Sequence, residues 1–371
     1  MIVGTVREIK TGENRVGLAP HGANQLVLNS HRVLVERSAG ANSGFSDDEY
    51  EKAGATIVNS AKEVWDKCDM IVKVKEPLES EFDFLHDGLI LFTYLHLAAE
   101  ERLTKELLSK KVVSMAYETV EFDDGSLPLL NPMSEVAGKM AVQVGAHYLE
   151  RTHGGFGKLL GGVAGVLPAK VTVIGTGIVG MSAAKVASAM GADVVIIGRN
   201  LNQLRYIDDL YQGKIKTLMS NPSNIEKSVV ESDLLIGGVA ITGAKAPKLV
   251  TREMVRKMKK GSVIVDVSID QGGFSETSRV TSHQNSIYVE EGVIHYCVPN
   301  MPGAVPNTST LALTNATLPY VLKIANMGFV KAIRTDNALL KGVNTYKGKL
   351  TNEGVAEAFG IEYENIEGLL S

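Results

Sequence analysis

Cysteine is scarce in this chain, and a long apolar run is missing. Only two of the 371 residues are cysteines, Cys68 and Cys297, and they lack the Cys-x-x-Cys spacing of redox and zinc motifs. Each lies in or beside an apolar segment, so we expect two buried, reduced thiols. No apolar stretch approaches the ~20 residues of a membrane helix, and the charged N-terminal segment MIVGTVREIKTGENR is unlike a signal peptide. We therefore expect a cytoplasmic protein without a membrane segment.

An excess of positive charge is missing as well. The 38 Lys and Arg residues are outnumbered by 42 Asp and Glu residues, which gives a formal net charge of −4. No basic patch with interleaved aromatic residues occurs, so we do not expect a nucleic-acid partner. The eight histidines show no metal-ligand spacing, and we expect no bound metal. Neither a Gly-x-Ser-x-Gly element nor a convincing nucleophile triad is present.

The chain does contain short apolar, β-rich segments that alternate with helical patterns. Strands are expected at 2–6, 31–36, 69–75, 88–94 and 111–117, and then at 170–175, 193–198, 214–219, 233–238, 262–267 and 293–298. Continuous apolar strands separated by helices are typical of parallel sheets covered on both faces. We therefore predict an α/β protein with two doubly wound, Rossmann-like domains and a cleft between them.

The expected boundary lies in a polar, turn-rich segment at 118–132, which precedes a long helical pattern at 133–152. We place a substrate domain at 1–128 plus 307–371 and a dinucleotide-binding domain at 129–306. Helical patterns at about 307–326 and 327–341 have no strand of their own. We expect them to pack on the first domain, so that the chain crosses between domains twice.

The segment VTVIGTGIVG places Gly175, Gly177 and Gly180 in Gly-x-Gly-x-x-Gly spacing, between a strand and a helical pattern rich in small residues. The first glycine permits a tight turn, the second lets the backbone approach a pyrophosphate, and the third allows close helix–strand packing. The N–H groups of the helix N-terminus are then available to phosphates. A purely structural turn is the alternative, but the strand–turn–helix context favours dinucleotide binding.

The acid that usually binds the adenosine ribose is absent. The strand at 193–198 ends on Gly198, followed by Arg199 and Asn200, whereas Asp193 lies at the wrong end of the strand. A carboxylate here would repel a 2′-phosphate, while a guanidinium matches phosphate geometry. One interpretation is therefore that the site accepts NADP(H). The other is that Gly198 eases the turn, Arg199 stacks on adenine, and NAD(H) binds.

Polar residues follow several expected strands, at the carboxyl ends where open α/β sheets bind ligands. In the first domain these are Lys73, Lys75, Glu76, Tyr94 and His96, with Arg15 before the first helix; in the second they are Asp266, Asp270 and Asn300. Singly, each has an ordinary explanation, because strand-end lysines are usually solvated and lone histidines usually belong to the surface or a satisfied core. Together they place Arg, Lys, His and Asp facing one cleft.

The segments REIKTGENRVGLAP, VKVKEPL, LFTYLHLA, SEVAGKMA, VIVDVSIDQGG and NMPGAVPNTST together resemble bacterial alanine dehydrogenase, and the resemblance runs from Met1 to about residue 365. It implies interconversion of L-alanine with pyruvate and ammonium, with hydride transfer to or from NAD or NADP, in a homohexamer. Relatives of that family include the dinucleotide-binding subunit of proton-pumping transhydrogenase. The departure lies at Gly198 and Arg199, where most members carry an acid and use NAD.

The resemblance also implies roles for individual residues. His96 and Asp270 are the expected catalytic residues, and the expected substrate contacts are Arg15, Lys75, Tyr94, Met133 and Asn300. The expected cofactor contacts are Ser134, Gly175, Gly177, Ile178, Val179, Gly180, Gly198, Arg199, Asn200, Arg205, Ser220, Val239, Ala240, Ile269, Asn300 and Met301. Two alternatives remain: a transhydrogenase subunit, and a catalytically silent nucleotide-sensing module.

Overall fold

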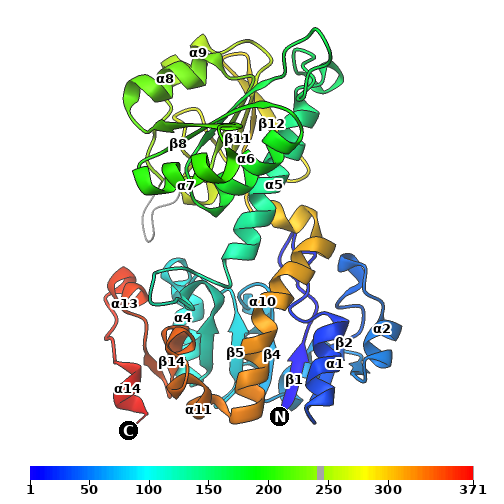
Figure 1. Ribbon diagram of the computed structural model, residues 1–371. Helices are drawn as coiled ribbons and strands as arrows, with labels where there is room; N and C mark the ends of the chain where they lie inside the picture. The colour runs from blue at the N-terminus through cyan, green and yellow to red at the C-terminus, as the bar shows by residue number, and fades with distance from the viewer. Residues whose placement is uncertain (240–245, 371) are drawn as a thin grey trace. The chain divides into compact units, whose positions relative to one another are not determined.

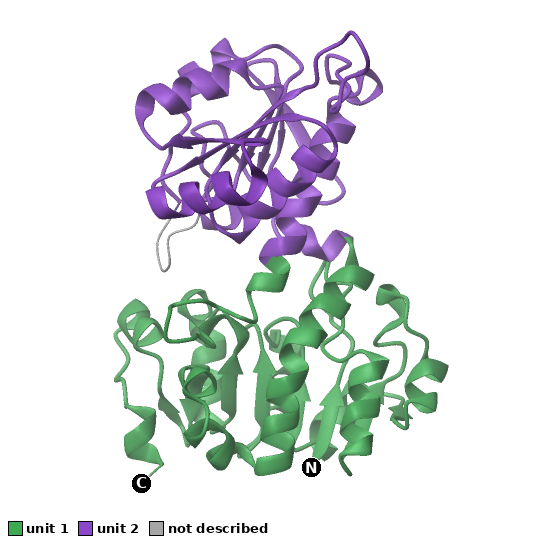
Figure 2. Cartoon of the chain, in the orientation of Figure 1, with its two compact units in different colours: residues 1–133, 305–371 green, residues 134–304 purple. Residues whose placement is uncertain are grey.

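The computed structural model describes residues 1–239 and 246–370, which form two compact units (Figure 2). Unit 1 comprises residues 1–133 and 305–371, and unit 2 comprises residues 134–304. The sequence analysis predicted the two domain boundaries after residues 128 and 306, whereas the units meet after residues 133 and 304. Each unit is built on its own sheet covered by helices (Figure 1). The expected class, two Rossmann-like α/β units, is confirmed.

Unit 1 contains an eight-stranded sheet in the order β15-β14-β6-β5-β4-β1-β2-β3. Its strands are β1 Ile2–Thr5, β2 Arg32–Glu36, β3 Thr56–Val58, β4 Met70–Val72, β5 Ile90–Thr93, β6 Val113–Ala116, β14 Val343–Tyr346 and β15 Lys349–Leu350. The strands from β3 to β6 are parallel, as their continuous apolar sequences predict. At the other edge, β14 is antiparallel to β6 and β15 is antiparallel to β14.

The helices of unit 1 follow from local signals. Its α-helices are α1 Pro20–Leu28, α2 Asp47–Lys52, α3 Ala61–Lys67, α4 Glu101–Ser109, α10 Pro306–Met327, α11 Phe329–Arg334, α12 Asn337–Lys341, α13 Glu353–Phe359 and α14 Ile366–Leu369. Proline occupies the first turn of α1 and α10, where its missing N–H costs nothing. Ser46 and Glu49 form a capping box at the start of α2. A core cluster around Trp65, Leu89 and Leu91 is fully buried.

Unit 2 contains a seven-stranded sheet in the order β12-β13-β11-β10-β7-β8-β9. Its strands are β7 Lys170–Ile174, β8 Asp193–Gly198, β9 Ile215–Met219, β10 Leu234–Gly237, β11 Val263–Asp266, β12 Ile287–Glu290 and β13 Val293–Tyr296. All neighbours are parallel except β12, which is antiparallel to β13. The order reverses direction at β7, so β7 and the adjacent β10 form the switch point at which such sheets bind ligands.

The helices of unit 2 flank this sheet. They are α6 Ile178–Ala189, α7 Leu201–Tyr211, α8 Pro222–Glu231 and α9 Arg252–Lys257, together with most of α5 Asn131–Tyr148. Asparagine side chains cap α7 and α8, and Thr251 caps α9. A core cluster that includes Ile174, Leu235, Ile264 and Phe274 anchors the strand ends near the glycine turn.

Several predictions of secondary structure are corrected. Every expected strand exists, with ends displaced by up to three residues, but β3, β12, β14 and β15 were not expected. Three of these, β12, β14 and β15, are antiparallel strands with polar residues, of which β12 and β15 lie at sheet edges, and β3 has only three residues. None of the four therefore gives a continuous apolar run. The sequence predicts no strand after residue 298, which is wrong. The helix expected at 327–341 is two helices, and the one expected at 133–152 spans Asn131–Tyr148.

Candidate active site

The glycine turn joins β7 to α6 in unit 2, and its three glycines have different physical roles. Gly175 has φ 113°, and a Cβ there would lie 2.3 Å from the Gly238 carbonyl oxygen. A Cβ on Gly180 would lie 1.9 Å from the Gly175 carbonyl oxygen, so only glycine lets α6 pack on the turn. Gly177 is the N-cap of α6, and among the described residues no atom lies within 4 Å of its Cβ position. The N-terminus of α6 is therefore open to an anion.

A cavity of about 790 Å³ lies over this turn, within unit 2. Ten of the expected cofactor contacts line it: Ser134, Gly175, Gly177, Ile178, Val179, Gly198, Arg199, Asn200, Ser220 and Val239. Gly180 lies beneath the turn as a packing residue, and Arg205, Ile269, Asn300 and Met301 are not among the lining residues. Ala240 lies outside the described residues. The size of the cavity and its position at the switch point fit a dinucleotide.

Gly198, at the end of β8, has no room for a side chain. A Cβ there would lie 2.3 Å from Thr176 Cγ2 and 3.2 Å from Thr176 Cβ. Thr176 is held in place because its hydroxyl donates a hydrogen bond to Gln203 Oε1, at 2.6 Å. Threonine is stiff at χ1, so the clash is not easily relieved by rotation. Thr176 therefore excludes a carboxylate from position 198 in this geometry.

The polar residues that follow Gly198 differ in how many hydrogen bonds they already make. Arg199 is exposed at the cavity, and within the described residues no carboxylate pairs with its guanidinium. Asn200 is the N-cap of α7: its Oδ1 accepts from the N–H of Asn202 (2.9 Å) and of Gln203 (3.3 Å). Arg205 donates to Asn202 Oδ1 at 3.2 Å. The positive charge of Arg199 thus lies where the ribose-binding acid is usually found.

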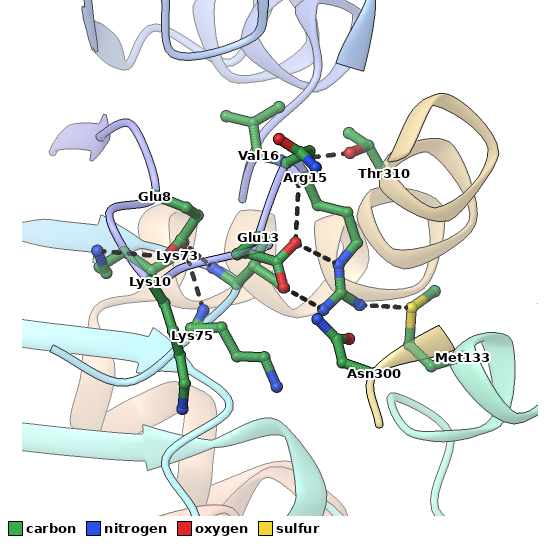
Figure 3. Close-up of polar contacts among 12 residues, drawn as sticks. Glu8, Lys10, Glu13, Arg15, Val16, Lys73, Lys75, Met133, Asn300 and Thr310 are labelled. Carbon is green, nitrogen blue, oxygen red and sulfur yellow. Dashed lines mark hydrogen bonds and ion pairs between the residues drawn. The ribbon is translucent and has the colours of Figure 1, made fainter. Parts of the chain in front are cut away.

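In unit 1, Arg15 is almost fully buried and is held by Glu13 (Figure 3). Its Nε donates to Glu13 Oε1 at 2.7 Å, its Nη2 donates to Glu13 Oε2, and its Nη1 lies 2.9 Å from Met133 Sδ. Burial alone would lower the pKa of Arg15, but the Glu13 carboxylate outweighs it and the pKa is raised. Glu13 therefore fixes the plane and the charge of the guanidinium.

Lys75 follows β4 in the same region of unit 1 (Figure 3). Burial, and then the nearby Arg15 cation, lower the pKa of Lys75. Its loop is tethered by the buried Glu8, which accepts from the N–H of Val74 at 2.6 Å and of Lys75 at 3.3 Å. Lys73 is fully buried, 2.8 Å from Glu81 and 3.5 Å from Glu8, and is part of the core rather than of a ligand site.

His96 lies after β5, and its side chain is 46% exposed. Its backbone has φ 50°, in the left-handed region, and Glu118 holds that backbone by accepting from the N–H groups of Leu95 and His96. The ring stacks on Tyr94, with 6.0 Å between centroids. Tyr94 is itself buried and donates to the Leu129 carbonyl oxygen at 2.6 Å, so its hydroxyl is committed to the fold.

Glu76 lies beneath His96. Its Oε2 lies 3.6 Å from His96 Nδ1, within ion-pair distance but longer than a normal hydrogen bond, and among the described residues this oxygen has no hydrogen-bond partner. Its Oε1 contacts the Lys10 ammonium. Burial favours protonation of this carboxyl, yet His96 and Lys10 outweigh it and lower the pKa of Glu76 to about 2. The carboxylate is therefore ionised and directs Nδ1 of the imidazole toward itself.

Asp270 lies in unit 2, on the 3₁₀ turn Ile269–Gln271 after β11, and is exposed. The turn is shaped by Asp266, whose buried carboxylate accepts from the N–H of Ser268 (2.9 Å), the N–H of Phe274 (3.0 Å) and the Ser278 hydroxyl. Burial raises the pKa of Asp266 to about 6, although these donors oppose the shift. Asp266 is thus a structural acid, and Asp270 is the carboxylate presented at the surface of the turn.

Three expected residues of unit 2 remain: Asn300 and Met301 follow β13, and Ile269 follows β11. Asn300 has φ 52°, in the left-handed region, and its carbonyl accepts from the Gly303 N–H at 2.9 Å. Ile269 and Met301 are buried, at 3% and 2% exposure.

Sequence reasoning missed four residues that organise these side chains: Glu13, Glu118, Thr176 and Gln203. Glu13 lies two residues before Arg15, but this spacing alone does not predict an ion pair. The two side chains meet because the backbone turns here, with the Glu13 N–H donating to the Lys10 carbonyl. Glu118 and Gln203 act across 22 and 27 residues. Thr176 lies inside the glycine motif, so its side chain could have been considered from the sequence.

The switch point, the glycine turn at the α6 N-terminus and the cavity define a dinucleotide-binding α/β protein. The chain belongs to the alanine dehydrogenase/PNT family: the description "Alanine dehydrogenase/PNT, N-terminal domain" matches residues 4–137, and "Alanine dehydrogenase/PNT, C-terminal domain" matches residues 141–353. The resemblance seen in the sequence is confirmed.

Individual relatives agree. "Alanine dehydrogenase 2" of Staphylococcus aureus (strain USA300) is 57% identical over 371 residues, which is 100% of both chains. A solved structure of an L-alanine dehydrogenase matches with 50% identity and a TM-score of 0.94, over 97% of this chain and 99% of the other. A transhydrogenase from Sinorhizobium meliloti matches with a TM-score of 0.82 but 23% identity, over 95% and 99%, and so shares the fold. Among the described helices, none has both the length and the apolarity needed to cross a bilayer.

Proposed function

We propose that this protein is an alanine dehydrogenase, which converts L-alanine, water and NAD(P)⁺ reversibly to pyruvate, ammonium, NAD(P)H and a proton. The observation that carries the proposal is 57% identity to a named alanine dehydrogenase over the full length of both chains. The transhydrogenase alternative is less favoured, since the corresponding identity is 23%.

The cavity of unit 2 fits the cofactor. The cofactor, when bound, supplies the acceptor or donor of the hydride. Gly175, Gly177 and Gly180 keep the N-terminus of α6 open for the pyrophosphate, and Ser134 lies on the wall of the same cavity.

Arg15 and Lys75 bind and polarise the substrate. The Arg15 guanidinium, oriented by Glu13, is suited to the substrate carboxylate, because a planar cation binds a carboxylate with defined geometry. The Lys75 ammonium is suited to the pyruvate carbonyl oxygen, where negative charge develops as ammonia adds to the carbonyl carbon. The lowered pKa of Lys75 favours sharing of its proton with that oxygen. Met133, which contacts Arg15, closes the same region of unit 1.

His96 and Asp270 transfer protons. Exchange of ammonia and water at the substrate carbon requires groups that accept and return protons, and an imidazole is suited to this near neutral pH. With Nδ1 directed at Glu76 and the ring stacked on Tyr94, His96 presents Nε2 to the substrate. Asp270 positions or deprotonates the attacking ammonia or water and stabilises a cationic iminium, and Asn300 contributes a contact to substrate and cofactor.

The test of this proposal is alanine oxidation by purified protein. His96→Ala and Asp270→Ala are each expected to reduce turnover by about 10²–10⁴-fold with the fold retained. Arg15→Ala is expected mainly to raise KM for pyruvate. His21→Ala, an exposed histidine on α1, is the matched control and should leave the rates unchanged. Near-normal oxidation by either catalytic variant removes that residue from the mechanism, and no alanine turnover by the wild-type protein ends the proposal.

We infer, further, that the cofactor site accepts NADP(H). Two observations support this: Thr176 excludes an acid from position 198, and the Arg199 guanidinium lies at the cavity without a carboxylate partner among the described residues. A 2′-phosphate placed against Arg199 gains a charge-assisted hydrogen bond. NAD(H), with Arg199 on adenine, is the competing outcome.

The ratio of kcat/KM for NADP to that for NAD decides between these. Arg199→Ala is expected to reduce kcat/KM for NADP by about 10-fold to 100-fold, the worth of one charged hydrogen bond, with a small effect on NAD. Gly198→Asp alone is expected to destabilise unit 2, and Gly198→Asp with Thr176→Gly is expected to fold and to favour NAD. A strong NAD preference in the wild-type protein contradicts the inference.

We infer from the resemblance that the protein assembles as a homohexamer, and the cytoplasm remains its expected location. Sedimentation of the purified protein tests the assembly: a mass near six chains supports it, and a monomer or dimer contradicts it.

A further inference from the structure

A group of metal-ligating side chains lies at the far end of α5, outside the cavity of unit 2. It consists of His147, Glu150 and His153, hereafter the α5-end cluster. His147 is in the last turn of α5, Glu150 follows the helix, and His153 ends the 3₁₀ turn Arg151–His153. The spacing of three residues between members places all three on one side of a helical turn.

The ligand atoms of this cluster already converge. One ligand atom from each residue lies within 4.8 Å of the other two. Glu150 Oε2 is 3.2 Å from His153 Nδ1, and the two imidazole rings are tilted by 34° with 3.7 Å between their centroids. Tetrahedral zinc, with bonds of about 2.0–2.1 Å to imidazole, sets neighbouring ligand atoms about 3.3 Å apart. Exposed side chains reach that spacing by small rotations.

The backbone beneath the cluster is firmly held. Leu149 is fully buried, and its carbonyl accepts from the N–H of Gly157 at 3.0 Å. Gly154 adopts φ 97°, and Gly155 donates to the Glu150 carbonyl at 3.0 Å. A Cβ on Gly155 would lie 2.4 Å from the Leu149 carbonyl oxygen, so this return of the chain requires glycine. The three ligands therefore project from a fixed turn.

We propose that the α5-end cluster binds a divalent transition-metal ion, with zinc as the best fit. Two imidazoles and one carboxylate are ligands typical of zinc, whereas calcium and magnesium prefer oxygen ligands alone. Three protein ligands leave one position for water. The metal clamps the end of α5 to the following turn and takes no part in alanine oxidation.

This proposal departs from the expectation of no metal that the histidine spacing gave. Histidines six residues apart are not a familiar ligand pair. They meet because the chain passes from α5 into a 3₁₀ turn, with the Gly154–Gly155 return behind it. The simpler alternative is a surface ion pair between Glu150 and His153 with His147 packed against it.

Zinc binding to the untagged, metal-stripped protein separates these alternatives. Isothermal titration with ZnCl₂ is expected to show one ion per chain, and His147→Ala and His153→Ala are each expected to lower the affinity at least about 10-fold, since even outer-shell changes cost that much. Glu150→Gln is expected to weaken binding as well. His21→Ala, exposed and remote in sequence, is the matched control. Because all three members lie at the surface, the variants should keep the wild-type melting temperature without metal.

A second readout identifies the coordination. Co²⁺ in place of zinc is expected to give the intense visible absorption of a four-coordinate site in the wild-type protein and not in His147→Ala. Zinc is expected to raise the melting temperature of the wild-type protein but not that of the variants, because it binds the folded state. No binding by the wild-type protein at a tenfold molar excess of ZnCl₂, or undiminished binding by His147→Ala and His153→Ala, overturns the proposal.

Discussion

Replacing Glu76 by Gln should change the acid stability of this protein by an amount that the structure sets. Glu76 is 3% exposed, and its pKa is lowered from 4.5 to about 2 by His96 and Lys10, against the effect of burial. One pKa unit corresponds to about 1.4 kcal/mol, so the ionised carboxylate contributes about 3 kcal/mol to the free energy of unfolding.

The sign follows from the direction of this pKa shift. Because the folded protein holds the proton less tightly than the unfolded chain, the contribution of Glu76 is complete above pH 4.5 and is lost as the pH falls toward 2. At pH 3 about 2 kcal/mol of it should be gone. The wild-type protein should therefore be more stable than Glu76→Gln near pH 7, and the two should converge in acid.

Urea unfolding between pH 7 and pH 3, at fixed protein concentration, measures this difference. Glu79→Gln is the matched control: Glu79 pairs with Arg102 at the surface, where both side chains are about two-thirds exposed. That pair should be worth less than about 1 kcal/mol at any pH. A difference between wild type and Glu76→Gln that is below 1 kcal/mol at pH 7, or that does not shrink in acid, would refute the reasoning.

Two further predictions concern packing. Gly180→Ala places a Cβ 1.9 Å from a backbone oxygen and should lower the free energy of unfolding by about 3 kcal/mol. Gly177→Ala, where a Cβ meets no atom of the described residues, should leave the melting temperature unchanged and weaken only cofactor binding, as measured by titration. Lys73→Met leaves two buried carboxylates without their cation and should lower the free energy of unfolding in urea by about 3–5 kcal/mol. The triple variant that adds Glu8→Gln and Glu81→Gln removes those charges and should recover much of the lost stability. Equal melting temperatures for the two glycine variants, or a triple variant no more stable than Lys73→Met, would contradict these assignments.

The parallel strands were predictable because burial on both faces demands continuous apolar sequence. Every residue is buried in two such strands, Ile90–Thr93 and Val263–Asp266, and each begins with three consecutive apolar residues. The hairpin of β14 and β15 was not predictable, because Asn344 and Thr345 are buried there through hydrogen bonds to their neighbours rather than through hydrophobicity. These polar side chains find their hydrogen-bond acceptors only after the strands have paired.

The glycine turn was determined by local sequence. Gly175 needs its positive φ and Gly180 its missing Cβ whatever else the chain does, so the nucleotide-binding loop is readable from ten residues. The individual side chains Arg15, Lys75 and His96 were also visible, since each follows or precedes a recognisable element.

The partners of those side chains were decided by tertiary structure alone. The Glu13 carboxylate that orients Arg15, the Glu118 carboxylate that holds the His96 backbone, and the Thr176 methyl that closes position 198 act through distances of a few ångströms. Such contacts depend on how the chain folds back on itself. Periodicity and local geometry constrain which segments become strands, helices and turns, but side chains distant in the sequence meet only once the sheets have been assembled.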